Sequence, residues 1–344
     1  MSESEVSKEG VRGVHHDREA TTGVNVGRSR RRRGRGRRGE QPMVPDAEFT
    51  SYYGKPVINA PVWSVPDIPG YLFLGGLAGL SSLLAAGSDF TRRAELAKAA
   101  KAGAFGAGVL SLIALIHDLG RPARFLHMLR VVKVTSPMNV GSWLLGAYVP
   151  ATGVAAAAAF TGKVPRLGAL ATAGAALLGP AVASYTAALI SDTAVPAWHD
   201  GYRDMPFVFV ASGATAAGGL GLLAAPTDQA GPARALAVAG VATELAAFER
   251  MRKKMGMVGE AYHSGKAKFY VRLSEALAVA GAAGALLGRR NRIISAMSGA
   301  ALLTASAATR WGIFHAGMIS SNDPKYVVVP QRERIRQREN HSKR

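Results

Sequence analysis

Ionisable side chains occur within or at the ends of long apolar segments of this chain. Placing such groups in hydrocarbon is costly, so each is a candidate for a functional role. The residues concerned are His117, Asp118, Asp192, Glu244, Glu249, Glu275, Arg310 and His315. If the segments cross a membrane an even number of times, all of these groups lie in one half of the bilayer. A shallow polar pocket suits a molecule with a polar head and a lipid tail better than it suits a channel, which needs polar groups along its full depth.

Two stretches between the apolar runs carry residue types that bind a quinone. One reads HDLGRP from His117, and the other reads SYTAALISDTAVPAWH from Ser184 to His199. A quinone needs a hydrogen-bond partner at each carbonyl and a route for the protons that follow the electrons. The candidates in these stretches are Tyr185, His117, Asp118, Asp192 and His199.

Each candidate also has a purely structural interpretation. A glutamate beside Arg250 near a helix end is often an interfacial ion pair, and Glu275 with Arg310 can be a buried pair that only joins two helices. His117 and Asp118 can cap a helix, and Tyr185 can be a packing residue. The grouping of these residues on one side favours a functional role for the set as a whole. It leaves the role of each single residue open.

The apolar residues that must position these groups gather in runs of bilayer length. Hydrophobic residues make up 48% of the chain, and its 40 glycines lie largely within these runs. Small residues let helices approach closely in lipid. We therefore expect an all-α polytopic membrane protein with about eight transmembrane helices. The expected spans are 69–88, 102–117, 140–160, 167–191, 205–225, 232–249, 269–288 and 293–317.

An even number of spans places both termini and the loops near 118–139, 192–204 and 250–268 on one side. We call these the working-face loops. Lysine and arginine near the helix ends occur on both sides, and the basic tails shift the balance toward the working-face side. The positive-inside rule therefore predicts that the working face and both termini are cytoplasmic, in the cell membrane.

The composition divides the chain into three expected regions. Residues 1–48 form a basic arm that we expect to be disordered, residues 49–318 the transmembrane domain, and residues 319–344 a polar basic tail. The net charge of +19 comes mainly from the tails, above all from RSRRRRGRGRR at Arg28 to Arg38. Such an arm can contact anionic lipid headgroups, act as a retention signal or hold RNA. We expect membrane lipid and no nucleic acid as its partner, because no RNA-binding fold follows the arm.

The chain contains no cysteine, which excludes disulfides and a cysteine-ligated iron–sulfur cluster within it. The histidines lack the paired positions of a bis-histidine haem, and we expect no metal site. We also expect no cleavable secretory signal, because the first 60 residues hold no apolar stretch. Any redox centre then belongs to a partner or to a diffusible carrier.

Four motifs, taken in their order along the chain, resemble those of the NrfD/PsrC family. They are SYYGKPV, IPGYLFLGGLAG, DLGRPARFLHMLRVVKVTSPMNVGSW and SYTAALISDTAVPAWH, within residues 50 to 330. The family comprises membrane subunits of polysulfide reductase-like and formate dehydrogenase-like complexes. The resemblance implies a haem-free core of two four-helix bundles. It also implies partners: a four-cluster ferredoxin-like iron–sulfur subunit and a molybdenum or tungsten molybdopterin catalytic subunit.

The resemblance also implies particular residues at a menaquinone or ubiquinone site. Tyr185 looks like the family tyrosine at the quinone head. Asp67 and Tyr71 occupy the start of the first core helix, where some members have a polar quinone ligand. Asp118 and Arg121 of DLGRP, together with Asp192, look like shared loop positions. Better-known members place the iron–sulfur subunit outside the cytoplasm, whereas the charges of this chain favour the cytoplasmic side.

The expected function is therefore that of a quinone-interacting anchor subunit of an oxidoreductase complex. Whether the chain is itself catalytic stays open. Electrons would pass from a partner cluster to a quinone held by Tyr185 and the His117–Asp118 segment. Protons would enter through Asp192 or through a path formed by Glu244, Glu275 and Arg310. An ion- or proton-translocating transporter and a purely structural anchor are the alternatives.

Overall fold

The computed structural model describes residues 5–7, 10–12, 56–119, 121 and 123–342. The chain divides into two compact units, Met1–Ala60 with Ser320–Arg344, and Pro61–Ile319. In the first unit, β1 (Glu5–Ser7) and β2 (Gly10–Arg12) pair antiparallel, and α11 (Lys325–Ser342) forms a helix in the basic tail that the sequence did not predict. Otherwise, the N-terminal arm lies outside the described residues, so its disorder stays a prediction.

The unit Pro61–Ile319 is built from long helices joined by short turns. Proline begins several of them, at the position where its missing N–H costs nothing. The helices are α1 (Asp67–Phe90), α2 (Ala94–Asp118), α3 (Ala123–Met128), α4 (Pro137–Thr161), α5 (Pro165–Ser191), α6 (Pro196–His199), α7 (Met205–Ala224), α8 (Gly231–Lys254), the 3-10 helix η1 (Gly256–His263), α9 (Gly265–Leu287) and α10 (Arg292–Asn322).

Six of these helices are long and apolar enough to cross a membrane: α1, α2, α4, α5, α7 and α9. The helical, multi-pass character predicted from the sequence is therefore confirmed. α8 and α10 are long enough but are not among the six, and both carry internal charged residues such as Glu244 and Arg310.

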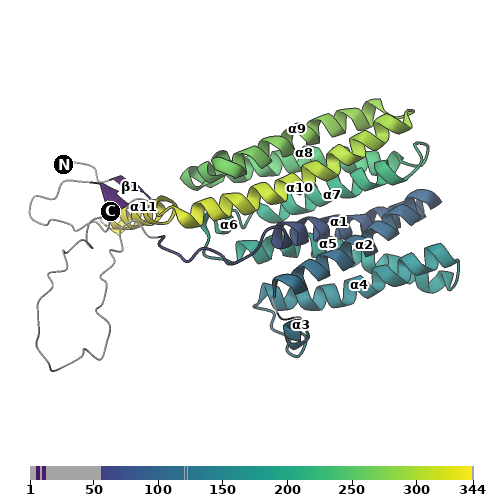
Figure 1. Ribbon diagram of the computed structural model, residues 1–344, viewed down its shortest axis with the longest axis horizontal. Helices are drawn as coiled ribbons and strands as arrows, with labels where there is room; N and C mark the ends of the chain where they lie inside the picture. The colour runs from purple at the N-terminus through teal and green to yellow at the C-terminus, as the bar shows by residue number, and fades with distance from the viewer. Residues whose placement is uncertain (1–4, 8–9, 13–55, 120, 122, 343–344) are drawn as a thin grey trace, which may run out of the picture. The chain divides into compact units, whose positions relative to one another are not determined.

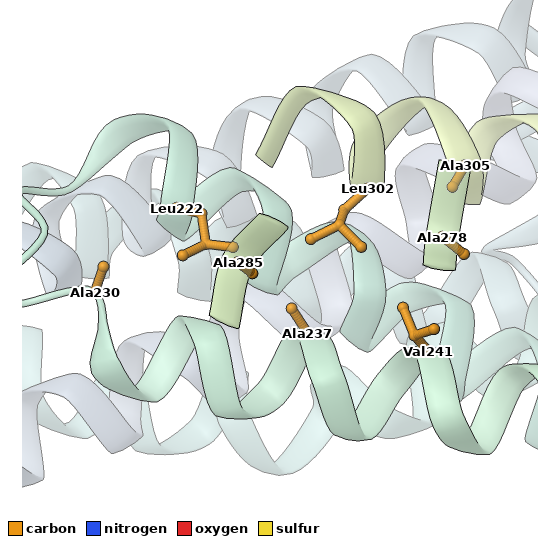
Figure 2. Close-up of a cluster of buried hydrophobic side chains, with 8 residues drawn as sticks. All are labelled: Leu222, Ala230, Ala237, Val241, Ala278, Ala285, Leu302 and Ala305. Atoms are coloured by element: carbon orange, nitrogen blue, oxygen red, sulfur yellow. The ribbon is translucent and has the colours of Figure 1, made fainter. Parts of the chain in front are cut away.

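Close contacts between small residues hold the helices together. A side chain at Gly79 of α1 would overlap the backbone carbonyl of Gly179 on α5, and one at Gly219 of α7 would lie against the carbonyl oxygen of Gly299 on α10. A buried cluster between α7, α8, α9 and α10 consists mainly of alanines, with Leu302 near its centre (Figure 2). Such contacts stabilise membrane helices by close packing, because lipid provides no hydrophobic driving force.

The contacts between helices show which of them are neighbours. α1 lies against α2, α5 and α7, while α4 lies against α2 and α5. α8 lies against α7 and α9. Figure 1 shows α1, α2, α4 and α5 side by side, with α7, α8, α9 and α10 next to them. The working-face loops join successive helices at one end, and the turns after α1, α4, α7 and α9 lie at the other.

Candidate functional site

A cavity of about 480 Å³ lies beneath two of the working-face loops. It is enclosed by the start of α4, the end of α5, the loop containing α6 and the start of α7. Three of the predicted quinone-site residues, Tyr185, Asp192 and His199, line it. The other lining residues are Val134, Thr135, Pro137, Val140, Ala188, Ser191, Tyr202 and Pro206. The wall is mostly apolar with a few polar groups, as is typical of sites for small organic ligands.

The Tyr185 ring packs against a glycine of α4 in the cavity wall. Its ring lies where a Cβ at Gly141 of α4 would be, so only glycine fits there without moving the ring. Within the described residues, the Tyr185 hydroxyl makes no hydrogen bond. A half-buried phenol of this kind is free to donate to a ligand oxygen.

Asp192 and His199 place two further polar groups at the cavity. Asp192 is the residue at which α5 ends, and its side chain is exposed. His199 directs Nδ1 to the carbonyl oxygen of Ser191 at 3.1 Å, and its ring stacks on Tyr202 with 6.1 Å between centroids. With Nδ1 donating to that carbonyl, Nε2 is left as an acceptor on the neutral ring. The cavity therefore offers a phenol, a carboxylate and an imidazole.

The loop that carries His199 is anchored from three sides. The indole of Trp198 is fully buried, donates to the carbonyl of Ile313 at 2.8 Å and stacks on Trp63 at 5.3 Å between centroids. Tyr262 of η1 donates to the carbonyl of Ala197 at 2.7 Å. Burial raises the pKa of the Tyr262 hydroxyl, so this donor stays protonated. The cavity wall is thereby fixed relative to α10 and η1.

The His117–Asp118 segment forms a separate polar cluster at the junction of α1 and α2. His117 Nδ1 lies 2.9 Å from Asp67 Oδ2, and Ser64 Oγ donates to Asp67 at 2.7 Å and to Asp118 at 3.1 Å. The Ser64 amide also donates to Asp118. None of these residues lines the cavity. The structure thus divides the predicted quinone ligands between two places.

Tyr71 and Arg121 occupy different surroundings. Tyr71, one turn beyond Asp67, is fully buried, and in the described part of the chain its hydroxyl has no hydrogen-bond partner. Arg121 is exposed in the loop after α2. Neither residue lines the cavity.

The predicted proton-path residues lie among α7, α8, α9 and α10. Glu244 is buried, and it accepts hydrogen bonds from Thr309 at 2.6 Å and Thr215 at 3.1 Å. Ser274 is 2.6 Å from the Thr309 hydroxyl. A void of about 10 Å³, enough for one water molecule, is lined by Glu244, Ser274, Thr309 and Glu275.

The alternative of a Glu275–Arg310 ion pair is wrong. Glu275 pairs with Arg252 at 3.1 Å, and Arg252 also binds Glu249 at 2.6 Å. Glu249 is thus ion-paired, with Arg252 and not with Arg250, which pairs with Asp204 at 3.1 Å. Arg310 is fully buried and donates to the carbonyls of Phe209 at 2.8 Å and Leu72 at 3.4 Å. These contacts reach α7 and α1.

Sequence reasoning missed Tyr202 and Thr135 in the cavity and Ser64 in the α1–α2 cluster. Both cavity residues fall in working-face loops, and an aromatic residue at a membrane surface was the available indication for Tyr202. Nothing in the local sequence marks Ser64, which lies 54 positions from its partner Asp118. Among the described residues, no group of three histidine or acidic side chains forms a metal site.

A multi-pass helical protein with a mostly apolar cavity beneath its working-face loops is the class that this fold and site define. The sequence pattern of the family described as "Polysulphide reductase, NrfD" matches residues 56–235, and the chain belongs to that family. No curated protein matches the chain. The family identity makes the chain a membrane subunit of a polysulfide reductase-like complex. The matched region contains α1 through α7 and hence the whole cavity.

Proposed function

We propose that the chain is the quinone-interacting membrane subunit of an iron–sulfur oxidoreductase complex. The observation that carries the proposal is the cavity lined by Tyr185, Asp192 and His199 in an otherwise apolar wall. Its volume of about 480 Å³ accommodates a quinone headgroup and the first part of its tail. An exposed apolar rim, including Val134 and Val140, offers the tail a path to lipid.

The three polar groups have complementary tasks in quinone reduction. A quinone takes up two electrons and two protons to become a quinol. Tyr185 donates a hydrogen bond to one carbonyl oxygen and stabilises the charge that develops there. His199 and Asp192 exchange protons with the other carbonyl side or with surface water. The reverse sequence describes quinol oxidation.

We further propose that α8 and α10 also cross the membrane, which gives eight spans in two four-helix bundles. Their internal charged residues make contacts within the protein: Glu244 accepts from threonines, and Arg310 donates to carbonyls, although its Nη1 has no partner among the described residues. A membrane accepts such groups when they face the bundle interior. Both termini are then cytoplasmic by the charge distribution.

The electron donor in this proposal is a ferredoxin-like iron–sulfur subunit bound to a molybdopterin enzyme of the formate dehydrogenase or polysulfide reductase type. The working-face loops present Leu126, Val131 and Val132 to the outside. Arg124 and Lys133 lie beside them. Exposed apolar residues next to cations form a surface suited to an acidic partner.

The test is quinone binding by the complex purified with its co-purifying subunits. Tyr185→Phe removes one hydrogen-bond donor, and we expect roughly tenfold weaker affinity for short-chain ubiquinone or menaquinone analogues. Intrinsic tryptophan fluorescence follows binding. Tyr270→Phe is the matched control, because Tyr270 stacks on His315 and does not line the cavity.

Unchanged affinity and unchanged quinone reduction in the Tyr185→Phe complex would instead support a structural anchor. A transporter would bind no quinone and need no redox partner. The Glu244 network is the observation that favours this second candidate function, since a buried carboxylate beside a water-sized void is a feature of ion and proton paths. Ion flux without any quinone effect would favour it.

A further inference from the structure

Arginines gather at the end of the helices opposite the working-face loops. They come from the turn between α1 and α2, the first turns of α8 and the turn between α9 and α10. We call them the arginine cluster: Arg93, Arg234, Arg289, Arg290 and Arg292. Within the described residues none of them forms an ion pair, whereas Lys98 and Lys101 of α2 are each paired with an acid. The positive-inside rule does not account for these cations, because it places this face away from the cytoplasm.

Three members of the cluster bind the ends of neighbouring helices. Arg93 and Arg292 each donate from Nη1 to a backbone carbonyl at 2.8 Å, Arg93 in the α7–α8 turn and Arg292 at the end of α7. Arg234 Nε donates to the carbonyl of Ala285 at 2.8 Å, in the last turn of α9. Carbonyls at a helix C-terminus lack helical partners and attract cations. These contacts are structural, but a guanidinium has five N–H donors and they use only some of them.

Two of these arginines keep buried donors that the protein leaves unused. Arg234 is only 8% exposed, and its Nη2 has no hydrogen-bond partner among the described residues. The same holds for Nε of Arg93, which is also buried. A buried N–H of a charged group costs free energy when it has no acceptor. The planar fork of a guanidinium matches the oxygens of a phosphate group, which would supply the missing acceptors.

The first turn of α8 contributes a second attraction for an anion at the same place. α8 begins at Gly231, and no side chain caps it. The N-terminus of so long a helix carries partial positive charge and presents backbone N–H groups that bind phosphate. A Cβ at Gly231 would lie 3.7 Å from Cζ of Arg93, so this guanidinium lies against the first turn of α8. Arg234 follows one turn later on the same side of the helix.

Exposed apolar side chains flank the cluster on α9 and α10. Leu286 and Leu287 precede Arg289, Ile293 and Met297 follow it, and each of the four is between 52% and 83% exposed. α9 is long and apolar enough to cross a membrane, so its end at Leu287 lies near a membrane surface. Cations at that level beside exposed apolar side chains match a lipid with an acidic head and acyl chains. A soluble anion would not need the apolar surface.

We propose that the arginine cluster binds the phosphate of an anionic phospholipid of the cardiolipin or phosphatidylglycerol class. Arg234 and the start of α8 bind the phosphate oxygens, and Arg289 and Arg290 add positive charge at the level of the headgroup. The acyl chains lie along Leu287 and Ile293. The inference does not depend on quinone binding, because no residue of the cluster lines the cavity.

Native mass spectrometry of the full chain with its co-purifying subunits tests the site. The complex in detergent is titrated with cardiolipin and, separately, with zwitterionic phosphatidylcholine. We expect the first cardiolipin to bind wild type at least about tenfold more tightly than phosphatidylcholine does. The double variant Arg289→Gln and Arg290→Gln should bind cardiolipin about tenfold more weakly than wild type.

The double variant Lys163→Gln and Arg166→Gln is the matched control. It removes two exposed cations from the α4–α5 turn, which lies on the same face outside the cluster. Its affinity for cardiolipin should change by less than about twofold.

A further variant tests the buried arginine. Arg234→Lys keeps the charge and loses the planar fork, so cardiolipin should bind about fivefold more weakly. Circular dichroism checks that the variant is folded. The thermal unfolding midpoint of wild type should rise when cardiolipin replaces phosphatidylcholine, and this rise should shrink in Arg234→Lys. If Arg234 only capped α9, the substitution would lower the midpoint equally in both lipids, which would contradict the proposal.

Equal affinity for cardiolipin in the two double variants, or no preference of wild type for cardiolipin, would overturn the proposal. Displacement of the lipid by millimolar inorganic phosphate would make the cluster a site for a soluble anion instead. Loss of a co-purifying subunit with unchanged lipid affinity would assign the cluster to a protein partner. Quinone affinity should be equal in wild type and in Arg289→Gln with Arg290→Gln, so failure of either proposal is seen independently of the other.

Discussion

At the residue scale, the cavity depends on a glycine as much as on the tyrosine it accommodates. The Tyr185 ring fills the space that a side chain at Gly141 would need, so α4 and α5 fit together only around this pair. For the proposed quinone, the Tyr185 phenol is thereby held in place before the ligand binds. Such preorganisation lowers the cost of binding, because no side chain must be ordered on contact.

Gly141→Ala should therefore displace the Tyr185 ring and weaken the proposed quinone binding by about tenfold, the same loss that we expect for removal of the phenol donor. Titration of the purified complex with a short-chain quinone measures this. Gly146→Ala is the matched control on the same helix, since its Cβ would meet only the Leu129 side chain at 4.0 Å. Equal affinity in the two variants would contradict the assigned position of Tyr185.

At the scale of elements, glycine contacts decide how closely the helices approach. Gly79 and Gly179 meet backbone to backbone where α1 crosses α5, and Ser82 lies beside them. A larger residue would push the helices apart and disrupt the contacts that the Tyr148 hydroxyl makes with the carbonyl of Ala78 and with Ser82 Oγ. The Tyr148 contacts and the helix crossing are thus parts of one arrangement.

Gly79→Val should lower the free energy of unfolding by about 3 kcal/mol or more, because backbone atoms cannot move aside as a side chain can. Thermal unfolding in detergent, followed by circular dichroism, gives the measurement. Gly174→Ala on α5 is the control, since no atom lies within 4 Å of its Cβ. That change should be neutral or stabilise the helix by about 0.5 to 1 kcal/mol. A small effect at Gly79 would rule out the tight crossing.

At the scale of the whole helical unit, Arg310 joins the two groups of helices. It lies on α10, donates to carbonyls on α7 and α1, and places its guanidinium 3.8 Å from the centre of the Phe209 ring. Its Nη1 has no partner among the described residues, so the two carbonyls and the Phe209 ring are the contacts that hold this fully buried cation.

Arg310→Leu should reduce stability by about 3 kcal/mol, since the buried carbonyls of Phe209 and Leu72 each lose a donor. Chemical unfolding in mixed detergent measures the change. Arg272→Leu, at an exposed position on α9, should change stability by less than about 0.5 kcal/mol. If both variants were equally stable, Arg310 would not tie the helix groups together.

The sequence determined those features that depend on local composition. Runs of small and apolar residues predicted the helices, because any chain in hydrocarbon must satisfy its backbone internally. The loop segment from Ser184 to His199 predicted Tyr185, Asp192 and His199 together, since they are close along the chain. The family likewise followed from short motifs and is confirmed.

Only the tertiary structure decided which polar groups share a place. His117 belongs with Asp67, 50 positions away, and not with the cavity. Glu275 pairs with Arg252 instead of Arg310. The contact between the Tyr148 hydroxyl and Ser82 was invisible in the sequence, where the working-face half alone appeared polar. Serine, threonine and tyrosine are common in apolar helices, and the helix faces that meet are set by packing between distant segments.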